Sequence, residues 1–253
     1  MKLVTQLHKV MQQELKAALK GEKSVAVAFS GGLDSSVLAK ICGDLNISVT
    51  LLTVGFAGSQ DMIFSEKIAS QLLFVHKKHN IQQDEFYEYL NRVKRRISCR
   101  STSHVENCIA YLFVAHLARE NGFNLVLTAN GIDELFCGYN QYRFILRYGE
   151  SSIMEFMHRK ILNELQLMDE IAVVTSYYGV TISRPFLSAQ FIEYAKTIPV
   201  DEKIKNEDDM LRKHIIRRLA LDIGVPYEAA MQPKKALQYG SSIHKYLIKH
   251  KYL

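Results

Sequence analysis

Short apolar runs alternate with longer amphipathic stretches over the first half of the chain. Four apolar runs bounded by turn residues predict β-strands, over residues 24–29, 47–54, 72–79 and 123–129. Helical periodicity fills the intervals, near 35–44, 61–71 and 103–122. Strands that alternate with helices indicate βαβ units, so we predict an α/β fold with a parallel sheet flanked by helices.

Helical patterning dominates the start and the second half of the chain. The first residues form an amphipathic helix with an apolar side at Leu3, Leu7, Val10, Met11, Leu15, Ala18 and Leu19. Beyond residue 139, segments 152–168 and 207–224 have helical periodicity, and we expect no strand there. We therefore predict an α/β part over residues 1–140 and a helical part over 141–253 that completes the same domain.

Composition narrows the class of protein but not its partner. The 253 residues are 48% hydrophobic and 23% charged, which is typical of a soluble globular protein. A net charge of +6 permits a nucleotide, an acidic metabolite or RNA as partner. No apolar run approaches the ~20 residues of a membrane span, and the start of the chain lacks a signal-peptide core. We expect a cytoplasmic protein without a membrane partner.

The cysteines show no paired spacing. Cys42, Cys99, Cys108 and Cys137 are scattered, with no histidine at zinc-finger distance. This pattern favours reduced thiols in an intracellular protein over a disulfide or a zinc site.

A glycine turn follows the first predicted strand. The sequence AVAFSGGLDSSVL, residues 26–38, places Gly31 and Gly32 between the strand and the next helix. In a parallel sheet such turns lie at the carboxyl ends of strands, where the N–H groups of the next helix bind anions. Three hydroxyl donors lie in the same turn, on Ser30, Ser35 and Ser36. The turn has no phosphate-loop lysine, and Asp34 instead suggests Mg²⁺ bridging carboxylate and phosphate oxygens. A plain capped turn would also explain the loop taken alone.

The run Ser30-Gly31-Gly32-Leu33-Asp34-Ser35 resembles the pyrophosphate loop (PP-loop) of the N-type ATP pyrophosphatases. Enzymes of that superfamily cleave ATP between its α and β phosphates, adenylate an oxygen of the acceptor, and let a nitrogen or sulfur nucleophile displace AMP. The resemblance implies that the loop holds the departing pyrophosphate, which accounts for the missing lysine. It implies ATP contacts by Ser30, Gly31, Gly32, Asp34, Ser35 and Ser36.

Four further stretches resemble the synthetase domain of the asparagine synthetase family, in that family's order. They are TVGFAGSQD (53–61), TANGIDELFCGYNQY (128–142), SRPFL (183–187) and PKKALQYGSS (233–242). The resemblance spans nearly the whole chain. It implies a Rossmann-like, adenine nucleotide alpha-hydrolase-like fold, in which residues 1–140 bind ATP, and an AMP-forming amide ligase that adenylates a small carboxylate such as aspartate.

The resemblance also implies roles for residues at the ATP site. Val54 and Gly131 are expected to contact ATP, and Asp34 and Asp133 to share Mg²⁺. Asp133 follows the fourth predicted strand, so it lies at the same sheet edge as Asp34, and carboxylates beside a polyphosphate need an intervening cation. Taken alone, Asp133 with Glu134 would be a helix-capping pair.

A lysine near the end of the chain carries the expected chemistry. Lys234 lies six residues before Gly240, the family's spacing for its catalytic lysine, which implies contact with ATP and stabilisation of charge on the α-phosphate and the tetrahedral intermediate. Taken alone, Lys234 and Lys235 would be a solvated pair. Arg184 either supports the site or holds a surface ion pair; the sequence leaves both open.

The sequence departs from the family pattern at the nitrogen side of the reaction. Asn130 stands where asparagine synthetases carry a Glu that handles ammonia and the intermediate, and where β-lactam synthetases carry a Tyr, so we take Asn130 as a catalytic candidate. Ser188 replaces an Asp and Cys137 a Gly. The chain begins Met1-Lys2-Leu3 without a glutaminase nucleophile, so we expect nitrogen from ammonia, an amine or a separate glutaminase subunit.

Residues 94–107 form a basic loop before a long helix, which we expect to be capped near Ser103. Arg96 and Arg100 either bind a substrate carboxylate or phosphate, or belong to a solvated loop. The group His104, Glu106 and Cys108 is better explained as a helix start with a buried thiol than as a metal site.

Two alternatives to a carboxylate ligase follow from the sequence. A PP-loop enzyme could adenylate a tRNA base for sulfur or nitrogen transfer, and the tail 244–253, with aromatic and basic residues, could contact RNA. The chain has no paired-cysteine motif to support this, and an amphipathic helix explains the tail, so nucleic acid is the weaker hypothesis. A scaffold that has lost its chemistry would not be expected to keep Ser30, Asp34, Ser35, Asp133 and Lys234 together.

Overall fold

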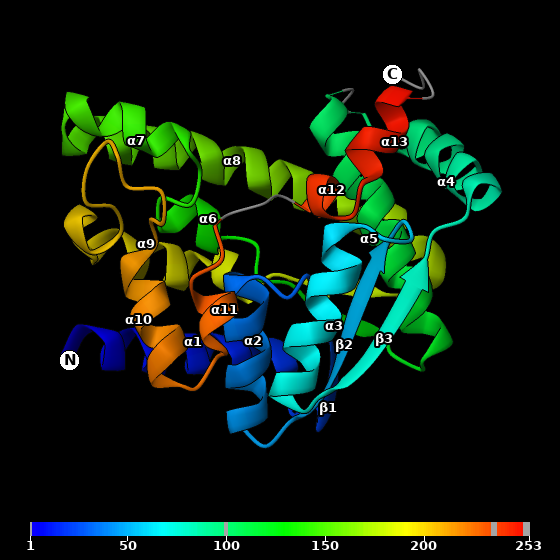
Figure 1. The fold of residues 1–253 in the computed structure, drawn as a ribbon, viewed down its shortest axis with the longest axis horizontal. Coiled ribbons are helices and arrows are strands. Elements are labelled where there is room, and N and C mark those ends of the chain that lie inside the picture. Colours follow the sequence, from blue (N-terminus) through cyan, green and yellow to red (C-terminus); the bar gives the residue numbers. More distant parts are fainter. Residues whose placement is uncertain (1, 99–100, 234–236, 250–253) are drawn as a thin grey trace.

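Five strands of the described chain form one parallel sheet in the order β3-β2-β1-β4-β5; Figure 1 labels β1, β2 and β3. The computed structural model describes residues 2–98, 101–233 and 237–249. The strands are β1 Ser24–Ala28, β2 Ser48–Gly55, β3 Val75–Asn80, β4 Leu125–Leu127 and β5 Thr181–Ser183. The parallel α/β fold expected from the sequence is therefore confirmed.

Helices make up most of the remaining chain. The α-helices are α1 Lys2–Leu19, α2 Leu33–Asp44, α3 Gln60–Leu72, α4 Gln83–Arg96, α5 Thr102–Glu120, α6 Ile132–Leu135, α7 Gln141–Ile145, α8 Glu150–Thr175, α9 Ala189–Thr197, α10 His214–Asp222, α11 Tyr227–Ala230, α12 Leu237–Gly240 and α13 Ile243–Lys249. The 3₁₀ turns are η1 Leu146–Tyr148, η2 Ser176–Tyr178, η3 Pro185–Leu187 and η4 Val200–Glu202.

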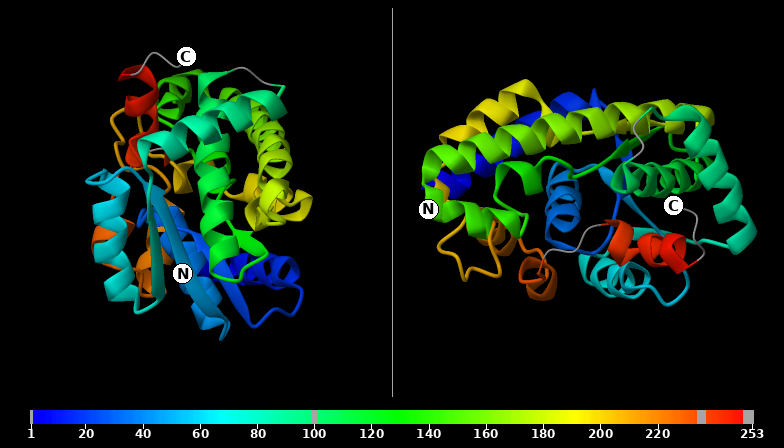
Figure 2. Two further views of the ribbon diagram at one scale, coloured as in Figure 1. Left: turned by 90° about the vertical axis from the view of Figure 1, so that its right-hand side faces the viewer. Right: turned by 90° about the horizontal axis from the view of Figure 1, so that it is seen from above.

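Helices cover both faces of the sheet (Figure 2). Successive residues of a strand point to opposite faces, and the central strands divide accordingly between two hydrophobic clusters. Val25 and Val27 of β1 pack into a cluster with α1, α2 and α10. Ala26 of β1 and Leu52 of β2 pack into the second cluster, with α4, α5 and part of α8. Burial on both sides explains why these strands read as continuous apolar runs.

The expected amino-terminal helix is confirmed as α1. Leu7, Met11 and Leu15 are fully buried in the core, and Leu3 and Ala18 pack partly buried against it.

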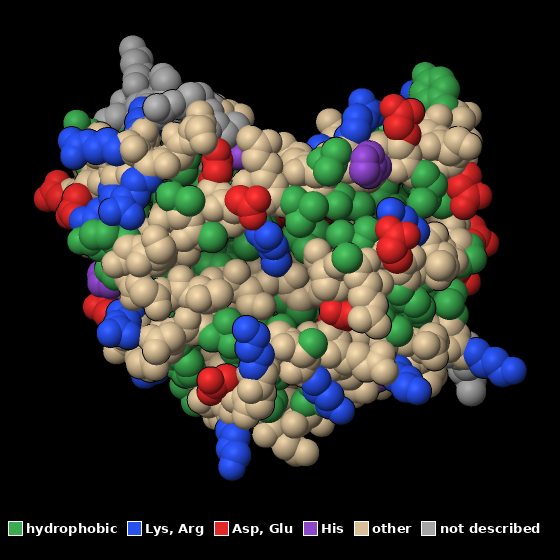
Figure 3. Space-filling model, turned by 180° about the vertical axis from the view of Figure 1, so that it is seen from behind, with side chains coloured by type: hydrophobic (Ala, Val, Ile, Leu, Met, Phe, Trp, Pro, Cys, Tyr) green, Lys and Arg blue, Asp and Glu red, His purple; other side chains and the backbone are tan. Residues whose placement is uncertain are grey.

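Figure 3 shows the face opposite to Figure 1, on which Lys and Arg side chains are scattered among hydrophobic and acidic ones. Over the described residues drawn there, no continuous basic surface of the kind that nucleic acids prefer is present.

The expectation of no strand beyond residue 139 is wrong. Residues 181–183 form β5, which pairs in parallel with β4 through Leu125↔Thr181, Val126↔Ile182 and Leu127↔Ser183. Three residues are too short to carry a period-two signal, and their pairing partner lies far away in sequence. The sheet therefore extends across the division that we placed near residue 140, and that division remains a prediction.

Two local boundaries also differ from expectation. The third strand begins at Val75, because α3 continues to Leu72 and ends at Leu73 in a left-handed conformation with φ 59°. Helix α5 is capped by Ser101, whose hydroxyl accepts a hydrogen bond from the backbone N–H of His104 at 3.3 Å, so the serine cap expected near Ser103 lies two residues earlier. Within the described part of the chain, none of the helices combines the length and apolarity required to cross a bilayer.

The buried cysteines allow a first prediction. Burial raises the pKa of the Cys42 thiol and that of Cys137 to about 12, and both side chains are fully buried free thiols. Because the thiolate is the reactive species, we expect iodoacetamide at pH 8 to leave both cysteines unlabelled in the folded protein. Peptide mass mapping checks this, with a urea-unfolded sample as the control in which both must react; rapid labelling of the folded protein would contradict it.

Candidate functional site

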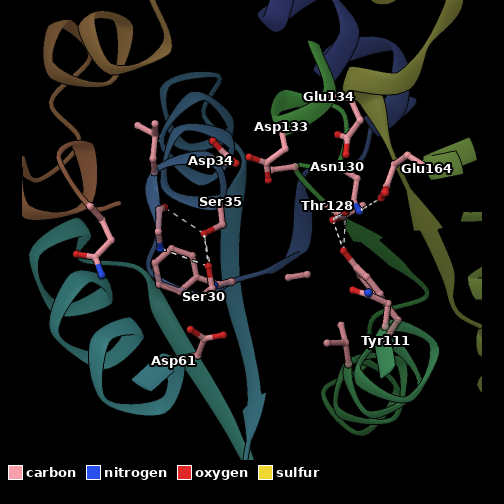
Figure 4. Close-up of a pocket in the computed structure, with 18 of the residues that line it drawn as sticks. Ser30, Asp34, Ser35, Asp61, Tyr111, Thr128, Asn130, Asp133, Glu134 and Glu164 are labelled. Atoms are coloured by element: carbon pink, nitrogen blue, oxygen red, sulfur yellow. Dashed lines mark hydrogen bonds between the residues drawn. The ribbon is translucent and has the colours of Figure 1, made fainter. Parts of the chain in front are cut away.

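A cavity of about 300 Å³ lies at the carboxyl ends of the central strands (Figure 4). Its walls come from the loops after β1, β2 and β4, from α5 and α8, and from the segments around residues 213 and 232. Because the strands are parallel, these loops meet at one sheet edge, where ligands of open α/β sheets bind. The predicted ATP-binding and metal-binding residues that the structure describes lie on or just behind this cavity.

The PP-loop, residues 30–36, turns tightly between β1 and α2. Gly31 has φ 78°, and a Cβ there would lie 2.9 Å from the Cα of Ser65, so only glycine fits without strain. The backbone N–H of Gly32 donates to Ser30 Oγ at 3.3 Å, and Ser35 Oγ donates to the carbonyl of Gly32 at 3.3 Å. The loop is thus held open toward the cavity by its own serines.

The predicted ATP contacts fall into two groups. Ser30, Gly32, Asp34, Ser35 and Val54 line the cavity. Three others, Gly31, Ser36 and Gly131, are not among the residues that line it. Ser36 is fully buried and donates to the Gly31 carbonyl at 3.3 Å, so it supports the loop. Gly131, with φ 106°, allows Phe186 to approach: a Cβ there would lie 2.2 Å from the Phe186 carbonyl oxygen.

A lysine that the sequence analysis did not identify joins the two predicted metal ligands. Lys213 Nζ lies 2.5 Å from Asp34 Oδ2 and 2.6 Å from Asp133 Oδ1. The lysine side chain is 4% exposed, and those of the aspartates are 20% and 13% exposed. Gly138 provides the necessary space, since a Cβ there would lie 1.9 Å from Asp133 Oδ1 and 2.4 Å from Lys213 Cε.

The segment that carries Lys213 is strained and firmly supported. Arg212 and Lys213 both have left-handed backbones, with φ 51° and 52°, a conformation that costs non-glycine residues about 1–3 kcal/mol each. The Asp209 carboxylate accepts from the N–H groups of Leu211 and Arg212 at 3.1 and 2.9 Å. The Arg217 guanidinium donates to the carbonyls of Leu211, Arg212 and Ala230. Consecutive strained residues held in this way are typical of functional sites.

These supports also perturb the ionisation of Asp209. Burial alone would raise the pKa of its carboxyl, but the backbone donors of Arg212 and Lys205, together with His214, hold that pKa below its ordinary value. A carboxylate with a depressed pKa stabilises the fold above its unfolded pKa and loses this effect as the pH falls through the folded value. The segment that carries Lys213 is therefore secured at neutral pH.

The two aspartates fit a Mg²⁺ ion. An oxygen of Asp34 and an oxygen of Asp133 converge on one point, which the ammonium of Lys213 occupies. Carboxylate oxygens are the ligands that Mg²⁺ prefers, and this ion is commonly held by one or two carboxylates with phosphate and water completing the octahedron. Among the described residues no group of three or more His, Cys, Asp or Glu could hold a metal ion.

Asn130 is held in one orientation by three neighbours on the opposite wall of the cavity. Its Oδ1 accepts from the hydroxyls of Tyr111, at 2.6 Å, and Thr128. Its Nδ2 donates to Glu164 Oε1, from α8. Burial raises the pKa of the Tyr111 phenol far above its usual value, so its hydroxyl stays a donor. The amide therefore presents its NH₂ to a carboxylate that is 6% exposed and lines the cavity.

Glu134, next to Asp133, has a structural role. Its Oε2 accepts from the N–H of Gly131 at 3.0 Å, and its Oε1 accepts from the Tyr139 hydroxyl. The capping interpretation of the sequence thus holds for Glu134, while Asp133 faces Lys213. Both residues line the cavity, but only Asp133 contacts Lys213, while Glu134 is engaged by Gly131 and Tyr139.

Several sequence candidates lie away from the cavity or outside the described residues. Arg184 forms an exposed ion pair with Asp169 at 3.0 Å, the second of the two alternatives. Arg96 lies over the Tyr177 ring at 5.4 Å, in a separate surface groove. Lys234, Lys235, Cys99, Arg100 and residues 250–253 of the tail lie outside the described residues.

The group at the start of α5 makes two contacts between a histidine and a carboxylate. His104 Nδ1 lies 3.2 Å from Glu170, and Glu106 lies 2.6 Å from His244 of α13. Cys108 is buried. The carboxylate partners differ, so these residues pack α5 against α8 and α13, in agreement with the helix-start interpretation.

The family model for asparagine synthase matches residues 6–176 and 173–251. The chain belongs to the asparagine synthase family. Similar proteins include one of Methanocaldococcus jannaschii that carries the provisional name glutamine-hydrolyzing asparagine synthetase 1, 28% identical over 96% of this chain and 50% of its own length. The asparagine synthetases of Bos taurus and Homo sapiens, both described as glutamine-hydrolyzing, are 24% identical over 89% of this chain and 41% of their own lengths.

The chain spans about half the length of the curated asparagine synthetases that it matches. Among solved structures, NMN synthetase of Francisella tularensis aligns with a TM-score of 0.40 and 15% identity, over 76% of this chain and 92% of that chain. Similarity at this level has no bearing on function.

Sequence patterns did not single out Lys213 and Glu164, two of the cavity residues of this asparagine synthase family member. Lys213 lies in the run Arg212-Lys213-His214, where nothing distinguishes it from its basic neighbours. Glu164 sits within an ordinary amphipathic helix, in which a buried carboxylate is rare. The sequence offered no signal that separates Glu164 from Glu170, which is also buried on α8.

Proposed function

We propose that this chain is an ATP-dependent, AMP-forming amide ligase that adenylates a small carboxylate, with aspartate the first candidate. The observation that carries the proposal is the convergence of the PP-loop with Asp34 and Asp133 in one cavity of an asparagine synthase family member. The carboxylate of the substrate attacks the α-phosphorus of ATP, the bond to the β-phosphate oxygen breaks, and pyrophosphate leaves with the electron pair.

The loop and the sheet edge suit the adenylation step. Gly32 and the first turn of α2 line the cavity, and the start of a helix, with its dipole, suits an anion such as pyrophosphate. Asp34 and Asp133 would hold Mg²⁺, which neutralises phosphate charge when bound. Lys213, already paired with both aspartates, places a positive charge beside the departing group.

Glu164 and Asn130 suit the amide-forming step. Nitrogen attacks the acyl carbon, the bond to the AMP oxygen breaks, and the nitrogen must lose a proton. An asparagine amide cannot accept that proton, whereas the Glu164 carboxylate beside it can. We assign Glu164 as the general base and Asn130 as the residue that positions it. A glutamate at 130 would place two carboxylates side by side, whereas the Asn130 amide donates a hydrogen bond to Glu164.

The cavity also offers a cation for an acidic substrate. Lys160 of α8 lines the cavity, and its Nζ lies 4.7 Å from the centre of the Tyr139 ring. Such a lysine could bind the second carboxylate of a substrate like aspartate. The relatives are named glutamine-hydrolyzing, and hydrolysis of glutamine releases ammonia, which supports ammonia as the nitrogen source. An amine or a separate glutaminase subunit as nitrogen donor remains a prediction. A cytoplasmic location also remains a prediction.

The nucleotide products test the proposed reaction. With aspartate, ATP, Mg²⁺ and ammonium chloride, we expect AMP and pyrophosphate in equal amounts and amide formation, because the PP-loop binds the β and γ phosphates as one leaving group. Ion-exchange chromatography of the nucleotides together with a pyrophosphate assay measures this. Asp133→Asn should lower the rate without unfolding the protein, since Asp133 lies at the cavity edge.

Replacing aspartate by other small carboxylates defines the acceptor. ADP as the main product would refute the proposed chemistry. If AMP formed only when tRNA was added, and formed without any small carboxylate, the result would favour a tRNA-modifying PP-loop enzyme instead.

A further inference from the structure

Lys213 occupies the position between the two predicted metal ligands. Its ammonium is within 2.5 Å of Asp34 Oδ2 and 2.6 Å of Asp133 Oδ1, and its side chain is almost fully buried. A divalent cation held by both carboxylates would need the same space. The ammonium and the ion therefore compete for one pair of oxygens, unless the lysine has somewhere else to bind.

The surroundings of Lys213 show that this contact is built into the fold. The lysine backbone is held in a left-handed conformation by the segment around Asp209 and Arg217. A Cβ at position 138 would collide with Lys213 Cε, so Gly138 keeps the path to the aspartates open. Rigid backbone support leaves the flexible lysine side chain as the part that can move.

We propose that Lys213 is a placeholder cation that keeps Mg²⁺ out of the Asp34–Asp133 pair until ATP is bound. This rests on the proposed function, in which Mg²⁺ and ATP meet at this edge. Without ATP, an ammonium and a divalent ion would face only two carboxylates, so like charges would repel at close range. With ATP, the phosphates offer new partners to the ammonium and further ligands to the ion, and both cations are accommodated.

The consequence is a binding order. Free metal does not load the apo site, and the ion enters together with the triphosphate. Removing the ammonium should therefore create a metal site in the nucleotide-free protein, while removing a carboxylate as well should abolish it.

Mn²⁺ binding followed by electron paramagnetic resonance tests this without turnover. For the wild-type chain we expect weak Mn²⁺ binding alone, and one tightly bound ion with α,β-methylene-ATP, which cannot be cleaved at the reactive bond. Lys213→Met should bind Mn²⁺ without nucleotide at least about tenfold more tightly than wild type. A neighbouring cation commonly lowers the pKa of a carboxylate by about one to three, and a change of one corresponds to a factor of ten in an equilibrium constant. Asp133→Asn combined with Lys213→Met should lose this gain.

A second measurement guards against misfolding of the variant. Because Lys213→Met leaves two carboxylates without their ammonium, Mn²⁺ alone should raise its melting temperature, whereas it should barely change that of wild type. Lys213→Gln, which removes the charge but keeps a hydrogen-bond donor on a side chain one atom shorter, should behave in the same way. Suppose that wild type binds Mn²⁺ only with the ATP analogue, but that Lys213→Met and Lys213→Gln bind Mn²⁺ without nucleotide no better than wild type. This result would overturn the placeholder role of Lys213 alone. Lack of analogue-dependent binding in wild type would overturn both the placeholder and the proposed use of Mg²⁺ and ATP.

Discussion

Glu164→Gln is expected to reduce amide formation about 10²–10⁴-fold, the usual contribution of a general base, while adenylation continues. The glutamine keeps the shape of the side chain and can still accept the hydrogen bond from Asn130 Nδ2, but its amide cannot take a proton from the attacking nitrogen. The two half-reactions can be measured separately. Isotope exchange between pyrophosphate and ATP reports adenylation, and amide product reports the second step.

A matched control lies on the same helix. Glu170 is also buried on α8, yet it pairs with His104 and does not line the cavity, so Glu170→Gln should change both half-reactions little once folding is verified. If Glu164→Gln slowed exchange and amide formation to the same extent, Glu164 would act in binding or folding, and its role as the base would be refuted.

Lys234→Ala is expected to lower turnover about 10²–10³-fold, the usual effect of removing one donor that stabilises developing charge, with little change in ATP affinity. Lys234 itself lies outside the described residues, but Gln232 and Pro233, immediately before it, line the cavity. The chain therefore enters the site just ahead of this lysine. One cation there can stabilise first the α-phosphate and then the oxygen of the tetrahedral intermediate.

Lys235→Ala is the neighbouring control and should be mild, because Lys235 does not match the family spacing to Gly240. Nucleotide affinity from equilibrium dialysis, measured beside kcat, separates the two effects. A severe loss in Lys235→Ala with a mild one in Lys234→Ala would move the catalytic role by one residue. Two active variants would leave the mechanism without this cation.

Sequence patterns predicted those parts of the molecule whose causes are local. The central strands β1 and β2 are buried on both faces, so their apolar runs were unmistakable. The PP-loop needs glycine and serine within a few residues of one another, and Asp133 lies in the short helix α6 that comes next after β4. Each of these features is encoded within a short stretch, so the amino-acid pattern alone places it at the correct sheet edge.

Features that depend on distant partners could not be predicted. Strand β5 exists because β4 offers it an open edge, and its three residues carry little signal of their own. The roles of Lys213 and Glu164 depend on the residues that they meet across the cavity: Asp34 for the first and Asn130 for the second. Arg184 shows the converse, since its family motif suggested a site role that its exposed pair with Asp169 does not support.

The pairing of Asp34 with Lys213 joins positions 179 residues apart. During synthesis from the amino terminus, both aspartates leave the ribosome well before this lysine does. Until residue 213 has emerged, Asp34 and Asp133 lack their ammonium, and two carboxylates without a cation disfavour close packing at this sheet edge. The loops that carry Asp34 and Asp133 are synthesised early, but their contacts are complete only when Lys213 is present. The proposed ATP-binding edge of this protein therefore becomes competent only after residue 213 has emerged.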